Sequence, residues 1–211
     1  MSAEEFGPDE FQRATNVSRE TLARLKVFVG LLEDWNQRHN LVSRGSVAHV
    51  WQRHVFDSAQ LVDFVPESAG SLVDLGSGAG FPGLILAALL VDRTGFRTVL
   101  FEATRKKCEF LATAAERIGV TAEIRNRRIE DAPPESFDVV SARACAPLPR
   151  LLQYAQRFQG PNTRDLFLKG QNIGDELTES HKYWKMKAHQ HPSRSDPSGA
   201  VLVIEGLRRA G

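Results

Sequence analysis

One short segment restricts the possible folds of this chain more than any other. Residues 71–75 form a short apolar run, and Asp74-Leu-Gly-Ser-Gly-Ala-Gly80 extends from its end with three glycines at alternate positions. A second apolar run, residues 83–90, follows directly. A short apolar run that leads into glycines is typical of a strand, and the longer run is typical of a helix. Glycines let the backbone turn sharply and approach a ligand with no Cβ in the way. The segment therefore predicts a strand, a ligand-binding turn and a helix.

The chain beyond this turn alternates between the same two kinds of segment. Residues 97–102 predict a second strand, and residues 104–118 predict a helix that Gly119 ends. Further strands are expected at residues 122–125, 137–141, 166–168 and 200–205, and further helices at residues 148–158 and 175–184. Residues 189–199, rich in Pro, Ser and Asp, are expected to be a loop or an irregular edge. This alternation predicts an α/β fold with a doubly wound, mostly parallel sheet covered by helices on both faces.

The first third of the chain has a helical pattern with no strand in it. After Ser18, a plausible N-cap, apolar residues recur at steps of three and four as far as Trp35. A second helix is expected over residues 47–65, ending near Pro66. We therefore expect residues 1–66 to be a helical N-terminal extension and residues 67–211 to be the α/β domain, the two forming one compact unit.

Composition argues against several classes of protein. The net charge is +1, with 42% hydrophobic and 25% charged residues, which is ordinary for a globular protein. The longest apolar stretch, residues 84–91, is too short to cross a membrane, and no signal peptide is apparent. The two cysteines, Cys108 and Cys145, do not suggest a disulfide framework, so a cytoplasmic location is expected. Cys and His have no zinc-like spacing, and we expect no metal.

A near-neutral chain can bind a nucleic acid only through a local concentration of positive charge. Three groups of basic residues are candidates: Arg105-Lys106-Lys107, Arg125 with Arg127 and Arg128, and Lys182 with Lys185 and Lys187. Each group, taken alone, is more simply explained as a solvated face that nearby acids balance.

Three kinds of ligand compete for the glycine turn. A phosphate-binding P-loop requires Gly-Lys-Ser/Thr after its spacer, and this sequence does not have it. A dinucleotide-binding turn requires Gly-x-Gly-x-x-Gly, but here its third position falls on Phe81, one residue after Gly80. The Asp-x-Gly-x-Gly-x-Gly spacing resembles motif I of the class I methyltransferases, which use S-adenosylmethionine. The resemblance implies that Gly76, Gly78 and Gly80 contact this cofactor.

Two acidic residues accompany the turn. Asp74 can steer the loop or accept hydrogen bonds from the cationic amino-acid part of the ligand. Glu102 ends the second predicted strand, about 20 residues beyond the turn, where an acid would accept hydrogen bonds from both ribose hydroxyls. Turn, strand and acid together favour a nucleoside-containing cofactor. A plain tight turn beside a solvated Glu102 would nevertheless have the same sequence.

The segment after the fourth predicted strand, Ser141-Ala-Arg-Ala-Cys-Ala-Pro147, bears on the methyl acceptor. It lacks the Asn/Asp-Pro-Pro-aromatic signature that positions an amino group, so amine methylation loses support. Cys145 is a weak candidate nucleophile because no activating partner is evident. Arg143 cannot act as a base. It suits an acceptor that has a free lone pair and no proton to lose, such as guanine N7, and catalysis would then be positioning.

Several segments are similar to the bacterial small-subunit ribosomal RNA methyltransferase G family, also called glucose-inhibited division protein B. They are Trp35-Asn36, Asn40-Leu41, Arg53-His54, Asp57-Ser58, residues 74–83, Lys106-Lys107, Phe110-Leu111, residues 128–130, Phe137-Asp138, residues 141–144 and residues 168–170. They occur in order between about residues 31 and 205, and Gly80-Phe-Pro-Gly83 and the Ser-Ala-Arg-Ala segment are the most specific. The acid at Glu102 departs from the Asp that many members have.

This resemblance implies N7 methylation of one guanosine in 16S rRNA near the decoding region. The partner would be 16S rRNA, the small subunit or an assembly intermediate, and the protein would act as a monomer. The cofactor residues would be Gly76, Phe81, Glu102, Ile129, Glu130 and Arg143, and the RNA contacts His54, Lys106, Arg128, Arg143 and Lys169. A methyltransferase for small molecules or proteins, or a non-catalytic binding module, remains an alternative on the same fold.

Some of these residues also have purely structural interpretations. Phe81 would staple the turn onto the next helix, and Ile129 would contact adenine through packing alone. Glu130 would act through its backbone as much as through its carboxylate. His54 on a helical face would be a structural hydrogen-bonding residue.

Overall fold

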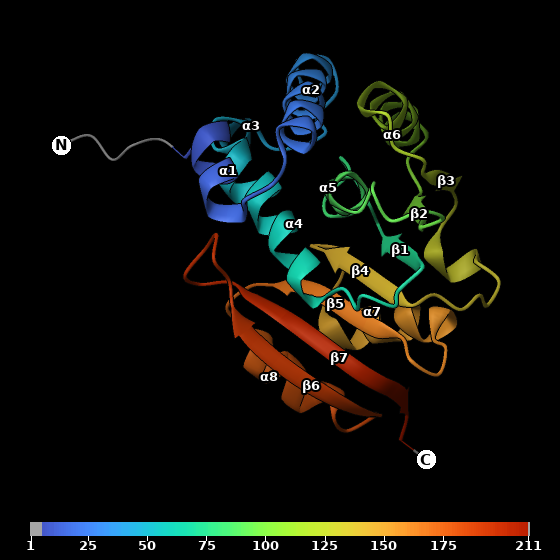
Figure 1. Ribbon diagram of the computed structural model, residues 1–211. Coiled ribbons are helices and arrows are strands. Elements are labelled where there is room, and N and C mark those ends of the chain that lie inside the picture. Colours follow the sequence, from blue (N-terminus) through green and yellow to red (C-terminus); the bar gives the residue numbers. More distant parts are fainter. Residues whose placement is uncertain (1–5, 211) are drawn as a thin grey trace.

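The computed structural model describes residues 6–210, apart from the side chain of Arg44, and contains one seven-stranded sheet (Figure 1). The strands are β1 (Ser71–Leu75), β2 (Arg97–Glu102), β3 (Glu123–Asn126), β4 (Val139–Arg143), β5 (Arg164–Lys169), β6 (Trp184–Pro192) and β7 (Ala200–Arg209). Their spatial order is β3-β2-β1-β4-β5-β7-β6. The first five strands are parallel, and β7 pairs antiparallel with both β5 and β6. The predicted doubly wound, mostly parallel sheet is confirmed.

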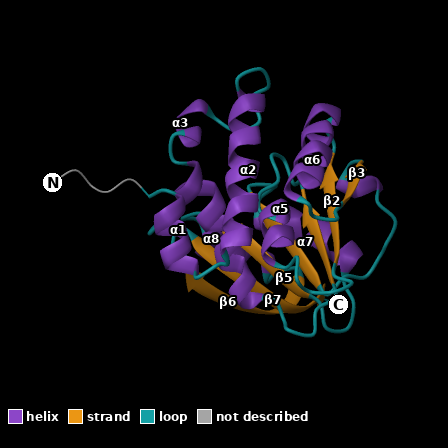
Figure 2. Cartoon of the chain, turned by 45° about the horizontal axis from the view of Figure 1, so that its top comes forward, coloured by secondary structure: helices purple, strands orange, loops and turns teal. Residues whose placement is uncertain are grey.

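Helices cover both faces of the sheet because its central strands are apolar on both sides (Figure 2). In β1, Leu72 faces one core, whereas Val73 and Leu75 face the opposite one. One face is covered by α5 (Gly83–Leu89) and α6 (Arg105–Ile118). The other is covered by α7 (Leu148–Ala155), the 3-10 helix η4 (Gln156–Phe158) and α8 (Ile173–Ser180).

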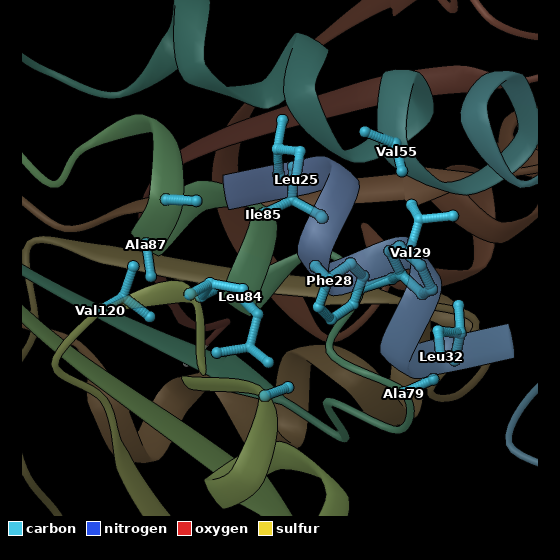
Figure 3. Close-up of a cluster of buried hydrophobic side chains, with 14 of the residues drawn as sticks. Leu25, Phe28, Val29, Leu32, Val55, Ala79, Leu84, Ile85, Ala87 and Val120 are labelled. Carbon is cyan, nitrogen blue, oxygen red and sulfur yellow. The ribbon is translucent and has the colours of Figure 1, made fainter. Parts of the chain in front are cut away.

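The segment before β1 is helical, as its pattern predicts. It contains α1 (Pro8–Thr15), α2 (Arg19–Asn36), α3 (Arg44–Val47), the π-helix η1 (Trp51–Phe56), α4 (Asp57–Ala59) and the 3-10 helix η2 (Gln60–Phe64). Ser18 caps α2 by accepting a 3.0 Å hydrogen bond from the Thr21 amide. Figure 3 shows Phe28 and neighbouring side chains of α2 packed against Leu84 and Ile85 of α5. The N-terminal helices thus share a core with the helices of the sheet.

The predicted helix over residues 47–65 is divided into three kinds of helix. Residues 51–56 form a π-turn, residues 57–59 an α-turn and residues 60–64 a 3-10 turn. π-Turns are rare and are often found at functional sites. This one begins the segment that carries His54 and Asp57.

One expectation for the C-terminal part was wrong. The helix expected over residues 175–184 ends at Ser180, and residues 184–192 form β6, the edge strand of the sheet. Residues 189–199, expected to be a loop or an irregular edge, comprise the end of this edge strand and the loop that follows it. In β6 Trp184, Met186 and Ala188 alternate towards the apolar core around α7. Only three apolar residues carry this period-two pattern, and it directly follows a helical segment. The structure describes no helix long and apolar enough to span a membrane.

Candidate functional site

The loops after β1, β2, β4 and β5 meet at one edge of the sheet because these strands are parallel and in register. Leu75 at the end of β1 lies opposite Phe101 of β2 and Ala142 of β4. Arg143 at the end of β4 lies opposite Leu168 of β5. Ligands of doubly wound sheets bind beyond the carboxyl ends of the strands. This edge contains the glycine turn, Glu102, Arg143 and Lys169.

The three glycines of the turn all adopt positive φ values, of 70°, 56° and 93° at Gly76, Gly78 and Gly80. Residues with a Cβ rarely adopt this conformation. A Cβ at Gly78 would have only the Gly76 carbonyl oxygen within 4 Å, at 3.8 Å, so this part of the turn is open. A Cβ at Gly80 would instead lie 3.0 Å from the side chain of Leu84. Gly78 therefore offers backbone to a ligand, whereas Gly80 is needed for packing against α5.

Asp74 is fully buried beneath this turn. Its Oδ1 accepts a 2.7 Å hydrogen bond from the Ser141 hydroxyl, and its Oδ2 accepts a 3.3 Å bond from the Gly83 amide. Burial raises the pKa of the carboxyl to about 6. Of its two predicted roles, the geometry supports steering of the loop, since neither oxygen is exposed to a ligand.

Glu102 meets the turn from the end of β2. Its Oε2 accepts a 3.0 Å hydrogen bond from the Gly78 amide, and its Oε1 accepts a 2.7 Å bond from the Thr104 amide at the start of α6. Each carboxylate oxygen can accept a second hydrogen bond. The open turn at Gly78 and this carboxylate therefore fit a nucleoside whose ribose hydroxyls donate to Glu102.

The predicted adenine-side residues lie on the 3-10 helix η3 (Ile129–Asp131). Ile129 is buried against the core around α7, which agrees with a role in packing. The Glu130 carboxylate accepts hydrogen bonds from Tyr154 Oη at 2.6 Å and Arg150 Nη2 at 3.1 Å. These bonds, and its partner Arg150, lower the pKa of Glu130. Its side chain is thus held against α7, and its backbone is the part available to a cofactor.

A cavity of about 930 Å³ lies beside the glycine turn, between η1, the ends of β4 and β5, and the loop that joins β6 to β7. His54, Arg143 and Lys169 all line this cavity. Neither the glycine turn nor Glu102 lines it. The structure therefore separates the predicted residues into a cofactor group and an adjoining cavity group. Arg128 and Lys106 belong to neither group and are exposed to solvent.

Arg143 is held in place at the mouth of this cavity. Its Nη1 donates to the Arg53 carbonyl oxygen at 3.0 Å and pairs with Asp57 Oδ2 at 3.4 Å. The guanidinium carbon lies 5.0 Å from the centre of the Phe81 ring. Nε and Nη2 have no acceptor among residues 6–210. One edge of the guanidinium is therefore anchored, and the other has donors to spare.

Phe81 connects the two groups of residues. It is buried, packs edge-on against Phe28 of α2 at 5.4 Å, and stacks on His54 at 5.0 Å. Phe81 was expected to staple the turn onto the next helix, but its aromatic contacts are with α2 and η1 instead. The same ring fixes the positions of His54 and Arg143 relative to the glycine turn.

His54 is partly buried, and its imidazole makes no hydrogen bond. Both ring nitrogens lack a partner among the described residues, which does not support a structural hydrogen-bonding role. Burial, with Arg143 and Arg53 nearby, lowers the pKa of the imidazole to about 3. A neutral imidazole with an unused donor and acceptor thus borders the cavity.

Lys169 is paired, contrary to the simplest view of an RNA-binding cation. Its Nζ lies 2.6 Å from Glu176 Oε2 of α8 and donates to the Ala146 carbonyl oxygen at 3.3 Å. Its positive charge is therefore partly balanced within the protein.

Asp57 and Ser195 were absent from the predicted site, although both line the cavity. The segment Asp57-Ser58 contributed to the family resemblance. Asp57 also lies four residues beyond Arg53, one helical turn away, so the sequence contained a signal that it belongs to the site. Ser195 lies in a region expected to be a loop or an irregular edge, and no motif there pointed to a functional site.

The remaining nucleophile candidate is unsupported. Burial first, and then the nearby Asp74, raise the pKa of the Cys145 thiol to about 11, so a thiolate is disfavoured. Within residues 6–210, no cluster of three or more His, Cys, Asp or Glu side chains could hold a metal ion.

Solved structures similar to this chain share its fold. A putative O-methyltransferase from Klebsiella pneumoniae has a TM-score of 0.61 at 16% identity, over 94% of this chain and 95% of that one. The O-methyltransferase from Bacillus cereus has a TM-score of 0.60 at 16% identity, over 94% and 96% of the two chains. The predicted class I S-adenosylmethionine-dependent methyltransferase fold is confirmed.

Sequence comparison identifies the family within this fold. The model of the family described as rRNA small subunit methyltransferase G matches residues 21–197. The ribosomal RNA small subunit methyltransferase G of Parvibaculum lavamentivorans is 50% identical, over 94% of this chain and 89% of that protein. The protein of the same name from Rhodospirillum centenum is 44% identical, over 100% and 96%. The chain thus belongs to the rRNA small subunit methyltransferase G family, as its sequence motifs predict.

Proposed function

We propose that this protein transfers the methyl group of S-adenosylmethionine to N7 of one guanosine in 16S rRNA, near the decoding region of the small ribosomal subunit. Family membership supports an rRNA substrate. The observation that carries the choice of N7 is the position of Arg143, which borders the cavity with one edge anchored and two donors unused.

The groups around Arg143 are poorly suited to remove a proton from a substrate. Burial raises the pKa of Asp57, but both of its carboxylate oxygens are engaged, one by Arg143 and the other by Ser195. The His54 imidazole, with its pKa lowered to about 3, is a weak base. An amine or hydroxyl acceptor must lose a proton during methylation, whereas guanine N7 has a free lone pair. These surroundings therefore favour N7.

The balance of the reaction agrees with such a site. S-adenosylmethionine supplies an electrophilic methyl group on a positively charged sulfur. The N7 lone pair forms the new N–C bond while the electron pair of the S–C bond stays on sulfur, and the positive charge passes to the purine. No proton is transferred. The protein has only to hold the two reactants in line and exclude water.

The residues of the chain divide this work. The open turn at Gly78 and the Glu102 carboxylate hold the nucleoside part of the cofactor. The free edge of Arg143 donates to guanine O6, which lies beside N7 on the same edge of the base. A donor at O6 fixes the ring and leaves the N7 lone pair unoccupied.

RNA affinity would come from a few cations outside the reacting centre. Lys106 in the first turn of α6 and Arg128 before η3 are exposed and suited to phosphate contacts. Lys169 borders the cavity and would exchange part of its pairing with Glu176 for a phosphate. This arrangement suits a protein with a net charge of only +1.

The test is to incubate the protein and labelled S-adenosylmethionine with small subunits from a strain that lacks the enzyme. Label is expected in 16S rRNA, and chemical cleavage specific for N7-methylguanine should map it to one position. Label on ribosomal protein or a small molecule would instead support the alternative methyltransferase. Cofactor binding with no transfer to any of these acceptors would indicate a non-catalytic module.

A further inference from the structure

The Asp57 carboxylate has several hydrogen-bond partners at the cavity, and the transfer mechanism above gives it no role of its own. It lies at the junction of η1 and α4, with its side chain 18% exposed. One carboxylate oxygen, Oδ2, faces Arg143 Nη1 at 3.4 Å. The other, Oδ1, accepts hydrogen bonds from Ser195 Oγ at 2.6 Å and Gln60 Nε2 at 3.0 Å. Both oxygens are therefore engaged, one on each side of the carboxylate.

The contacts at Oδ1 fix the carboxylate from two elements far apart in the sequence. Ser195 belongs to the loop between β6 and β7, 138 residues beyond Asp57. Gln60 holds the same loop, since its Oε1 accepts a 2.9 Å hydrogen bond from the Arg194 amide and its Nε2 lies 3.0 Å from Ser193 Oγ. The loop is thus docked on the helical segment, and Asp57 has little freedom to rotate away from Arg143.

The charge of this pair matters for the proposed reaction. Transfer to N7 leaves a positive charge on the purine, and an uncompensated guanidinium beside it would oppose that charge in a site with little water. A carboxylate 3.4 Å from the guanidinium makes the pair neutral overall. The ion pair engages Nη1 alone, so the Nε and Nη2 donors stay available to the base.

We propose that Asp57 is a positioning residue for methyl transfer, an inference that rests on the proposed function. It neutralises Arg143 and anchors its Nη1 edge, so that the free edge meets the guanine without electrostatic repulsion of the methylated product. The loop of residues 193–196 contributes through Ser195, which holds the carboxylate in this orientation. This loop of the cavity wall therefore influences, through Asp57, how Arg143 is presented.

The alternative is that Asp57 only fastens the loop between β6 and β7. The variant Asp57→Asn separates the two roles, because the amide oxygen can still accept from Ser195 while the negative charge is lost. Under our proposal, kcat on small subunits falls about 30-fold. The KM for the subunit and the Kd of S-adenosylmethionine stay within about twofold of the wild-type values. Asp57→Glu, which restores the charge on a longer side chain, should recover part of that rate.

A double-mutant cycle with Arg143→Ala gives the decisive readout. If Asp57 acts through Arg143, adding Asp57→Asn to Arg143→Ala lowers the rate by less than about twofold further. An additive loss in the double variant, or a wild-type rate for Asp57→Asn, would overturn the proposal. Wild-type protein that fails to methylate RNA at all would instead refute the proposed function, so the two failures are distinguishable.

A second pair of variants keeps the test valid if Asp57→Asn does not fold. Ser195→Ala removes one hydrogen bond to the carboxylate and should lower kcat about threefold. Ser198→Ala is the matched control, because Ser198 lies in the same loop but donates to Asp196 and makes no contact with Asp57. Equal rates for these two variants would contradict the proposal.

Discussion

The cofactor side and the acceptor side of this site are built in different ways. The glycine turn, Asp74 and Gly83 come from one continuous segment, and Glu102 joins them from the neighbouring strand, 24 residues beyond Gly78. The cavity beside them combines η1, the ends of β4 and β5, and the loop after β6. Its central contacts join residues that are 86 and 138 positions apart. A motif thus encodes the first side, and tertiary packing assembles the second.

The two sides also differ in how their polar groups are satisfied. On the cofactor side, Asp74 and Glu102 both accept hydrogen bonds from loop amides or hydroxyls. On the acceptor side, His54 has two buried nitrogens without partners in the described part of the chain. Arg143 likewise keeps two donor groups unused. The buried His54 nitrogens cost stability because they have no partner, whereas the Arg143 side chain is partly exposed and its unused donors are accessible to a substrate.

The largest expected effect tests the acceptor side through Arg143. Arg143→Ala should reduce methyl transfer about 10³-fold, or about 4 kcal/mol, because the guanine loses the donor that orients it. The fold should persist, since the residue is at the end of β4 and not in its interior. Transfer rates and thermal unfolding check both statements. Unchanged activity would remove Arg143 from the mechanism and undo the contrast between the two sides.

The next effect tests the packing beneath the cofactor side. A Cβ at Gly83 would lie 2.4 Å from Leu100 Cδ2 and 2.7 Å from Asp74 Oδ2. Gly83→Ala should therefore lower the free energy of unfolding by about 3 kcal/mol, as measured by urea denaturation. Gly174→Ala in α8 is the control, because a Cβ there has no atom within 4 Å and should slightly stabilise the helix. Similar stabilities for the two variants would refute this view of the turn.

A third prediction concerns the unsatisfied His54. Its pKa in the fold, about 3, is below the ordinary 6.5, so the unfolded chain binds the proton more readily between these values. The stability linked to His54 is present above pH 6.5 and is lost as the pH falls towards 3. His54→Phe should abolish this loss. Between pH 7 and 5 the free energy of unfolding of the variant should fall by about 2 kcal/mol less than that of the wild type. Urea denaturation at both pH values tests this; identical pH profiles would show that His54 is not buried uncharged.

The smallest expected effect concerns Lys169. Lys169→Ala should weaken binding to small-subunit RNA about fivefold and reduce the slope of log affinity against log salt by about 1. The loss is limited because the ion pair with Glu176 already compensates part of the positive charge of Lys169. Measuring the RNA affinity at salt concentrations from about 50 to about 200 mM tests the slope. A loss of affinity with an unchanged salt slope would show that the lysine shapes the cavity without contacting phosphate.

The regular part of the fold could be predicted from local patterns. The bounds of β1 and β2 follow from apolar runs. The start of α2 follows from Ser18, and the end of α6 follows from Gly119. These signals depend on residues close in sequence, where backbone preferences and periodicity act directly. The same holds for the glycine turn.

The parts that could not be predicted depend on distant partners. Strand β6 lies at the edge of the sheet, and only Trp184, Met186 and Ala188 carry its alternating pattern. The π-turn at residues 51–56 adds a residue to one helical turn, which no periodicity of a 3.6-residue helix reveals. Asp57 meets Ser195 only after β6 has brought the chain to the cavity. The catalytic environment of Arg143 therefore required the structure.

The most direct test of the central claim is to identify the methylated nucleoside itself. Small subunits that lack the modification would be incubated with S-adenosylmethionine and either the wild-type protein or Arg143→Ala, and their 16S rRNA would be digested for mass spectrometry. The wild type should produce one equivalent of 7-methylguanosine per rRNA, and the variant should produce almost none while still binding the cofactor. Methylation of a guanine amino group, of N1 or of ribose would contradict an acceptor site that works without a base.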